Sequence, residues 1–433
     1  MMYWNEKAET MPREEMRRIQ GELLRGAVKR AYERVAPYRA KMKQTGVEPG
    51  DINTLEDIEK LPFTDKADLR DAYPYGMFAV GMDEVIRIHA SSGTTGKQTV
   101  VGYTRKDIEI WNECMARCMT MAGVTRGDIV QVAYGYGLFT GGLGGHYGAE
   151  YIGAATVPAS TGNTKRQLQI LEDFGSTVLL CTPSYAMLLG DAVREAGIKG
   201  KLKLKSGIHG AEPWTEGMRR ELEDRLGYKA YDIYGLSEIS GPGVSCDCEA
   251  AAGLHVQEDH FYPEIVDAHT GKQVKDGMPG ELVFTCLTKE ALPLIRYNTR
   301  DICTLRKDKC ACGRTLARMG KITGRTDDML IIRGINVFPS QVESVLLGIA
   351  EVSPHYLLVV DRKNNLDTLE VRVELREGFP FDEVRRVEEL ERRIGKEINS
   401  TLSISADIRI SPIGSVERSE GKAKRVLDLR KNL

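Results

Sequence analysis

The stretch Thr177-Val-Leu-Leu-Cys-Thr-Pro-Ser184 is an apolar run ending in a Thr-Pro pair, and a helical pattern follows it over residues 184–196. A strand followed by a helix is the repeating unit of a parallel sheet with crossover helices. The same alternation occurs on both sides of this stretch, in VIRIHA (85–90) with 105–122, DIVQVAYGYG (128–137) with 142–151, TVPAS (156–160) with 164–174, and LKSGIHGAEP (204–213) with 215–226. The sequence therefore predicts an α/β fold.

The regions outside this alternation have different patterns. Residues 11–43 have apolar side chains at helical spacing, which predicts an amphipathic packing helix. From residue 261 onward, strand patterns occur without helices in between, which predicts a small antiparallel β region. After residue 327 the order is strand, helix, strand, strand, long helix and strand. We therefore predict a large domain at 1–326 and a small α+β domain at 327–433.

The charges are nearly balanced, with 60 Lys and Arg against 62 Asp and Glu and a formal net charge of -2. This balance gives no reason to expect a nucleic acid or a membrane surface as partner, so we expect a small molecule. The first residues have no apolar run typical of a signal peptide, which predicts a cytoplasmic protein. Nine cysteines are too few for a disulfide scaffold, and clustered ones indicate metal binding.

A segment rich in Gly, Ser and Thr, SSGTTGKQ, begins at Ser91. Backbone amides beside glycine, hydroxyl donors and a lysine are groups that bind phosphate. The segment is not a Walker A loop, because that motif has four residues between its glycines and Ser or Thr after its lysine. The alternative is a plain turn between a strand and a helix. The candidate phosphate-binding residues are Ser91, Ser92, Gly93, Thr94, Thr95, Gly96 and Lys97.

Five segments together resemble the adenylate-forming superfamily of acyl-CoA synthetases, luciferases and peptide-synthetase adenylation domains. They are SSGTTGKQ at 91, HGAEP at 209, YDIYGLSE at 231, YNTRD at 297 with GRTDD at 324, and SEGKAKR at 419. The segments between them are most similar to the phenylacetate-CoA ligase branch. The resemblance implies that a carboxylate attacks the α-phosphorus of ATP and releases pyrophosphate. The thiol of coenzyme A then attacks the acyl-adenylate, and AMP leaves.

The resemblance also implies roles for residues of the ATP site. The loop that begins at Ser91 is expected to hold the β- and γ-phosphates, Tyr234 to stack on the adenine, and Asp301 to accept hydrogen bonds from the ribose. Glu238 is the candidate Mg²⁺ ligand, and Arg325 is expected to contact phosphate. Further candidate nucleotide-binding residues are Gly210, Ala211, Glu212, Pro213, Asp232, Ile233, Gly235 and Ser237.

The last segments imply a mobile small domain. Asp327 matches the hinge about which this domain moves between the two half-reactions. Lys422 matches the lysine that bridges the carboxylate and the α-phosphate in the first half-reaction only, and Lys424 is its rival. Gly334 matches the glycine beside the path of the pantetheine arm of coenzyme A. The implied partners are ATP, Mg²⁺, coenzyme A and an aryl carboxylate, and formation of a homodimer is left open.

Aromatic residues lie in the segment that lines the acyl pocket in this superfamily. Tyr134, Tyr136 and Phe139 precede Gly141, and an aryl ring needs a flat apolar slot of this kind. We expect Ile239 and Pro242 to form the opposite wall. The alternative is an aromatic cluster in the core.

Two Cys-x-Cys pairs lie in predicted loops, and a histidine follows the first pair. Thiolate and imidazole groups of this kind fit a structural Zn²⁺ ion, which takes four ligands. Five residues are candidates for the four ligand positions. We favour Cys248, His255, Cys310 and Cys312, with Cys246 as the substitute. The alternative is a group of reduced cysteines without a metal.

Two other functions are weighed against an aryl-acid CoA ligase. The first keeps adenylation but changes the acid or the acceptor. The second is a nucleotide-binding protein without catalysis, which would be expected to lack Lys422, Glu238 or Asp301. All three are present.

Overall fold

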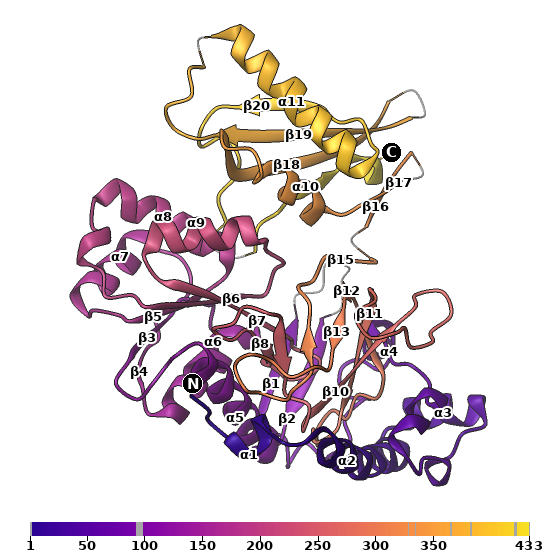
Figure 1. The fold of residues 1–433 in the computed structure, drawn as a ribbon. Coiled ribbons are helices and arrows are strands. Elements are labelled where there is room, and N and C mark those ends of the chain that lie inside the picture. The colour runs from indigo at the N-terminus through magenta and orange to yellow at the C-terminus, as the bar shows by residue number, and fades with distance from the viewer. Residues whose placement is uncertain are drawn as a thin grey trace. The chain divides into compact units, whose positions relative to one another are not determined.

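The computed structural model describes residues 2–91, 98–327, 329–333, 335–363, 366–381, 383–419 and 422–432. The chain divides into two compact units, which are described separately (Figure 1). The first unit contains Met1–Cys181, Ile198–Ala211 and Tyr228–Lys321, and the second contains Thr182–Gly197, Glu212–Gly227 and Ile322–Leu433. The domain boundary at Asp327 stays a prediction.

The predicted helix over residues 11–43 is divided into α2 (Arg13–Arg34) and α3 (Ala36–Thr45). Val35 between them has extended backbone angles. Pro37 lies in the first turn of α3, where its missing N–H removes no helical hydrogen bond. Shorter elements of this region are α1 (Glu6–Glu9), η1 (Pro49–Asp51), η2 (Leu55–Lys60) and α4 (Lys66–Asp71).

The first strand of the predicted alternation does not join the parallel sheet, so that prediction was wrong. β1 (Arg87–Ser91) pairs antiparallel with β2 (Thr99–Tyr103), a strand that sequence analysis missed. The SSGTTGKQ segment therefore connects the two strands of a hairpin. Its residues 92–97 lie outside the described residues.

A nine-stranded mixed sheet forms the centre of the first unit, and its parallel half confirms the predicted alternation. β7 is the junction, because it is parallel to β6 and antiparallel to β8. The parallel strands are β3 (Ile129–Val132), β4 (Ala155–Val157), β5 (Val178–Cys181), β6 (Ser206–Gly210) and β7 (Lys229–Leu236); the antiparallel strands are β8 (Gly241–Cys246), β9 (Leu254–Val256), β13 (Leu305–Arg306) and β14 (Arg318–Met319). The order is β13-β14-β9-β8-β7-β6-β5-β3-β4.

Helices of the first unit follow several of these strands. α5 and α6 lie side by side, and both pack against β8 (Figure 1). The helices are α5 (Arg105–Met121), α6 (Thr140–Ile152), α7 (Thr164–Asp173) and η3 (Lys199–Lys201). The predicted antiparallel region is also present, as β10 (Phe261–Val266), β11 (Gly280–Cys286) and β12 (Tyr297–Cys303), paired in this order.

The second unit contains a sheet in which β18 and β19 form a long antiparallel pair. β21 and β20 join this pair at its two edges as parallel neighbours. Helix α11 buries Leu390, Ile394, Ile398 and Leu402, which recur every four residues along one face. The elements are α8 (Pro183–Ala196), α9 (Glu216–Leu226), β15 (Gly324–Arg325), β16 (Leu330–Ile332), β17 (Ile335–Val337), α10 (Pro339–Leu346), β18 (Val352–Lys363), β19 (Leu366–Leu375), α11 (Val384–Leu402), β20 (Asp407–Ser411), β21 (Val426–Asp428) and η4 (Leu429–Asn432).

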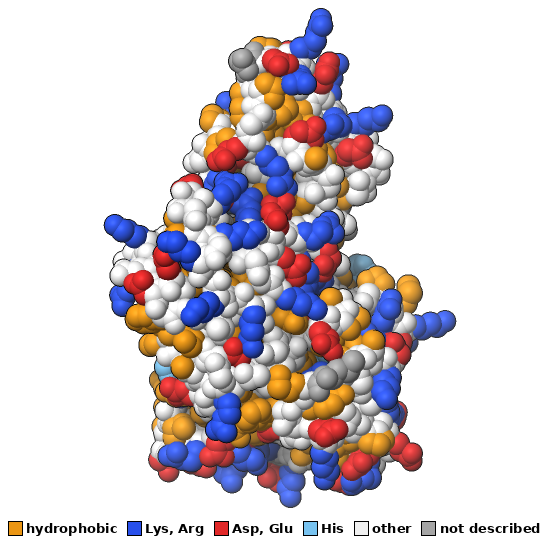
Figure 2. Space-filling model, turned by 60° about the vertical axis from the view of Figure 1, so that its left-hand side comes forward, with side chains coloured by type: hydrophobic (Ala, Val, Ile, Leu, Met, Phe, Trp, Pro, Cys, Tyr) orange, Lys and Arg blue, Asp and Glu red, His pale blue; other side chains and the backbone are white. Residues whose placement is uncertain are grey.

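Basic and acidic side chains are interspersed over the face drawn in Figure 2, in keeping with the small net charge. Among the helices of the described residues, none is long and apolar enough to cross a membrane.

The close contact between α5 and α6 depends on glycine. A Cβ atom on Gly148 of α6 would lie 2.4 Å from the Cβ atom of Met115 in α5. We expect Gly148→Ala to lower the free energy of unfolding by about 1–3 kcal/mol, because an overpacked core must shift its backbone. Gly26→Ala in α2 is the matched control, since nothing lies within 4 Å of its Cβ position. Urea unfolding should show a loss for Gly148→Ala only; equal effects of the two changes would contradict the packing argument.

Candidate functional site

Two predicted nucleotide-binding motifs meet at the carboxyl end of β7. The Tyr234 hydroxyl donates a hydrogen bond of 2.5 Å to the Asp301 carboxylate of β12. Burial and then the charge of Asp301 raise the pKa of the Tyr234 phenol well above its usual range. The Phe284 ring of β11 stacks against the Tyr234 ring, with 6.3 Å between centroids. Tyr234 is thus held at its hydroxyl by Asp301 of the YNTRD motif and at its ring by Phe284 of β11.

The chain turns immediately after β7, at residues 237–240. Ser237 and Glu238 lie in this turn and are 5% and 6% exposed. The Ser237 hydroxyl oxygen lies 3.2 Å from that of Thr140, the first residue of α6. The Glu238 backbone carbonyl accepts a hydrogen bond of 3.2 Å from the Lys289 ammonium group. The turn is thus restrained at the Ser237 hydroxyl and at the Glu238 backbone carbonyl.

The HGAEP motif begins at the end of β6, beside β7. Gly210 pairs with Ile233, and a Cβ atom on Gly210 would lie 2.0 Å from the Ile233 carbonyl oxygen. Ala211 then has a φ of +72°, a left-handed conformation that is uncommon for alanine. Such backbone strain is concentrated at functional sites. The other predicted residues of β7, Asp232 and Gly235, lie in the same strand.

The predicted residues of the second unit form two local contacts. The Arg325 guanidinium donates to both carboxylate oxygens of Asp327, over 2.8 and 2.9 Å. The Glu212 carboxylate accepts hydrogen bonds from the backbone amides of Ser184 and Ala423. Ala423 directly follows Lys422, whose side chain is exposed, and Pro213 is also exposed.

Five of the predicted acyl-pocket residues lie in or against α6. The ring of Phe139 lies against Gly141, where a Cβ atom would be 2.5 Å from Phe139 and 3.4 Å from Tyr134. Pro242 of β8 lies opposite Gly235 of β7. The remaining members are Tyr136, whose hydroxyl lies 3.2 Å from His146 Nδ1, and Ile239, which is fully buried.

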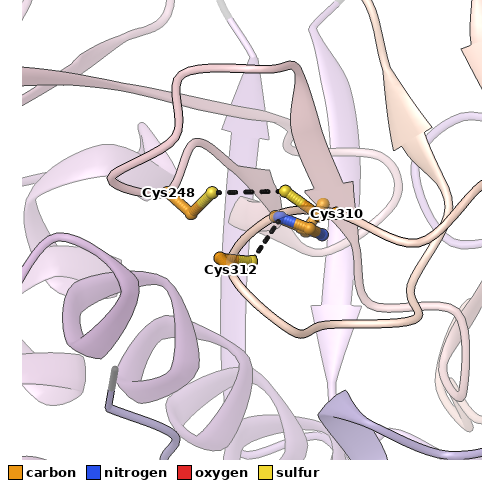
Figure 3. Close-up of side chains that lie close together, drawn as sticks. Cys248, Cys310 and Cys312 are labelled. Carbon is orange, nitrogen blue, oxygen red and sulfur yellow. Dashed lines mark hydrogen bonds between the residues drawn. The ribbon is translucent and has the colours of Figure 1, made fainter.

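Four of the five predicted metal ligands come together. Donor atoms of Cys248, His255, Cys310 and Cys312 all lie within 4.8 Å of one another, and all four residues are buried. The Cys248 and Cys310 sulfurs face each other (Figure 3) and lie 3.9 Å apart. Cys312 Sγ lies 3.4 Å from His255 Nε2. In a tetrahedral zinc site with Zn–S of about 2.3 Å and Zn–N of about 2.0–2.1 Å, such atoms lie about 3.8 and 3.5 Å apart. The donor set therefore fits Zn²⁺.

The substitute ligand Cys246 lies elsewhere. Its thiol donates to the backbone carbonyl of Cys118 in α5 over 3.6 Å.

A hydrogen bond with His255 lowers the pKa of the Cys310 thiol, which favours the thiolate form that binds metal.

The N-terminal segment contacts the loop that carries Cys310 and Cys312. The Tyr3 hydroxyl donates to the Cys312 carbonyl over 3.0 Å. Arg314 and Glu9 form a buried ion pair of 2.6 Å, and the Thr315 amide donates to the Glu9 carbonyl. The loop that carries Cys310 and Cys312 is therefore held against the N-terminal segment.

Some predicted residues lie outside the described residues, namely Ser92, Gly93, Thr94, Thr95, Gly96, Lys97 and Gly334; Ser91 is the last residue of β1. Conversely, sequence analysis missed Tyr103 and Lys289, which contact the turn after β7. Lys289 gave only a weak signal, as one of two basic residues beside an apolar run that Arg296 ends. Tyr103 gave no signal in the sequence, because tyrosine is common in strands.

Known families match the greater part of the chain. The family described as AMP-binding enzyme matches residues 29–285, and the AMP-binding enzyme C-terminal domain matches residues 334–430. A phenylacetate-coenzyme A ligase of Thermus thermophilus is 50% identical, with 100% of each chain covered. One of Escherichia coli is 50% identical, with 98% of this chain and 97% of that protein covered.

A solved structure shares the fold. A 2-hydroxyisobutyryl-CoA ligase in the postadenylation state, in complex with R3-HIB-AMP, is 29% identical with a TM-score of 0.93; the match covers 99% of this chain and 93% of that one. The fold, the motifs and these relatives define an adenylate-forming enzyme of the AMP-binding family. Within that class the chain belongs to the phenylacetate-coenzyme A ligase family, as its motifs predicted.

Proposed function

We propose that this chain joins phenylacetate to coenzyme A through an acyl-adenylate, releasing AMP and pyrophosphate. The hydrogen bond between Tyr234 and Asp301 is the observation that carries the proposal, because it joins two motifs that are far apart in the sequence. Both motifs are expected to contact one nucleoside, one at the adenine and the other at the ribose. The full-length relatives at 50% identity support phenylacetate as the acid.

Adenylation requires positioning and charge neutralisation more than covalent chemistry by the protein. In our proposal the Asp301 carboxylate accepts hydrogen bonds from the ribose hydroxyls, and Tyr234 provides the surface for the adenine. Arg325 contacts phosphate, which would compete with its ion pair to Asp327. Lys422 supplies positive charge between the carboxylate and the α-phosphate in the first half-reaction. The remaining HGAEP and YDIYGLSE residues contact the nucleotide, and Gly334 borders the pantetheine path.

A magnesium ion bound with ATP would neutralise phosphate charge. Glu238 is the residue that we propose to hold it, because a carboxylate is the ligand type that Mg²⁺ prefers. The acyl group would occupy the space beside Tyr134, Tyr136, Phe139 and Gly141, with Ile239 and Pro242 on the opposite side. Assembly as a homodimer and a place in the cytoplasm stay predictions.

The half-reactions provide the direct test. We expect Lys422→Ala to slow pyrophosphate formation from phenylacetate and ATP by about 100-fold, because a charge that stabilises the transition state is lost. Transfer of a supplied phenylacetyl-adenylate to coenzyme A should stay close to the wild-type rate. Lys424→Ala is the matched control and should affect neither step.

Three outcomes would count against these assignments. A wild-type chain that forms no pyrophosphate with phenylacetate would refute the proposed function. Equal loss of both half-reactions in Lys422→Ala would refute the role of that lysine. A larger effect of Lys424→Ala would transfer the role to Lys424.

We also propose that Cys248, His255, Cys310 and Cys312 bind one structural Zn²⁺ ion. Three sulfur donors and one nitrogen donor fill the four positions that the ion takes, which leaves no open position for a substrate. The cluster joins the loop after β8 and the strand β9 to the 310–312 loop. We therefore assign it to the stability of the first unit.

Metal analysis tests the zinc proposal. The purified chain should retain about one zinc ion per molecule after dialysis, because a closed four-ligand site releases its ion slowly. Cys310→Ser should lose the ion and lower the temperature of unfolding. Cys246→Ser is the matched control and should keep the ion. A dialysed wild-type chain without zinc, or equal zinc loss in both variants, would contradict the assignment.

A further inference from the structure

The turn after β7 is held from outside by side chains that sequence analysis did not select. The Tyr103 hydroxyl lies 3.3 and 3.2 Å from the backbone carbonyl oxygens of Ser237 and Ser240 in the turn, and its single proton is shared between these two acceptors. The Lys289 ammonium group donates to the Glu238 carbonyl over 3.2 Å, and the Cys286 thiol to the Ile239 carbonyl over 3.8 Å. All four backbone carbonyls of residues 237–240 therefore lie within hydrogen-bond distance of a side-chain donor, and two of them share the Tyr103 proton.

The groups that hold the turn are themselves fixed. Tyr103 is fully buried and stacks on Trp111, with ring centroids 5.2 Å apart. The Lys289 ammonium lies 4.5 Å from the centre of the Tyr103 ring. Asp107, at the start of α5, accepts the backbone amides of residues 290 and 291 over 2.7 and 3.0 Å. Neither donor can follow a displaced turn without breaking these contacts.

A buried ammonium group at this place is costly. Lys289 is 6% exposed, and burial lowers its pKa. The carboxylates of Asp107 and Glu238 oppose this effect, so the charge is partly balanced. An apolar side chain of similar length would avoid the desolvation penalty and still fill the space. Stability alone therefore does not explain a lysine here.

We propose that Tyr103 and Lys289 are positioning residues for the first half-reaction, because they fix the backbone from which the Glu238 carboxylate projects. This inference rests on the proposed function, in which Glu238 holds the magnesium ion of ATP. Neither residue contacts the nucleotide in this account. Each acts through the turn, in the way that outer groups orient the ligands of a metal.

Magnesium dependence of the two half-reactions tests the proposal. In Tyr103→Phe and Lys289→Met, pyrophosphate formation from phenylacetate at fixed ATP should fall about tenfold or more, and half-maximal rate should require about tenfold more Mg²⁺. Excess Mg²⁺ should restore part of the rate. Transfer of a supplied phenylacetyl-adenylate to coenzyme A should stay close to wild type.

Two buried or part-buried donors of the same unit provide matched controls. Tyr38→Phe removes a hydroxyl that donates to the Pro62 carbonyl, and Lys41→Met removes an ammonium that donates to the Phe63 carbonyl. Both should leave the Mg²⁺ dependence unchanged. If Lys289→Met does not fold, the nearly isosteric Tyr103→Phe decides the question.

The outcomes separate this inference from the proposed function. A wild-type chain without pyrophosphate formation refutes the proposed function, and the inference with it. An active wild-type chain whose Tyr103→Phe variant keeps the normal Mg²⁺ dependence refutes the inference alone. An equal loss of both half-reactions in that variant also refutes it, because a general structural defect would then be the cause.

Discussion

β7 is hydrogen-bonded as a parallel strand to β6 and as an antiparallel strand to β8, and the two candidate sites of the first unit depend on this double pairing. The parallel side brings Gly210 and Ala211 beside the strand. The antiparallel side requires the chain to reverse directly after Leu236, which produces the turn that carries Ser237 and Glu238. If β7 were paired on one side only, the HGAEP segment and the turn at residues 237–240 would not both be brought to this strand.

The antiparallel pairing also separates Glu238 from the candidate metal cluster. In β8, Gly241 lies opposite Leu236, whereas Cys246 lies opposite Ile233, so the chain returns toward the amino end of β7. Cys248 follows in that direction, and Glu238 lies at the carboxyl end. This separation agrees with a structural role for the zinc ion that we propose.

The sequence predicts the local features well. The alternation over residues 128–226 was correct, because apolar runs and helical spacing are properties of adjacent residues. The four side chains that cluster are the set that was favoured as metal ligands, although ligand chemistry alone does not separate Cys248 from Cys246. The errors came from short strands with a weak sequence signal. β2 was missed, so β1 was assigned to the parallel sheet although it pairs with β2 in a hairpin, and the short strands β8 and β9, which have no clear periodicity, were also missed. No pattern indicated that Tyr103 would contact the turn after β7, because the contact joins residues 134 and 137 positions apart in the sequence. The roles of the site residues stay predictions.

The release of pyrophosphate from ATP, measured with a panel of carboxylates in the presence and absence of coenzyme A, decides whether the chain is an aryl-acid CoA ligase. We expect the highest rate with phenylacetate, a lower rate with straight-chain acids, and a thioester together with AMP when coenzyme A is present. Absence of pyrophosphate with phenylacetate, or AMP formation that does not depend on coenzyme A, would contradict this expectation.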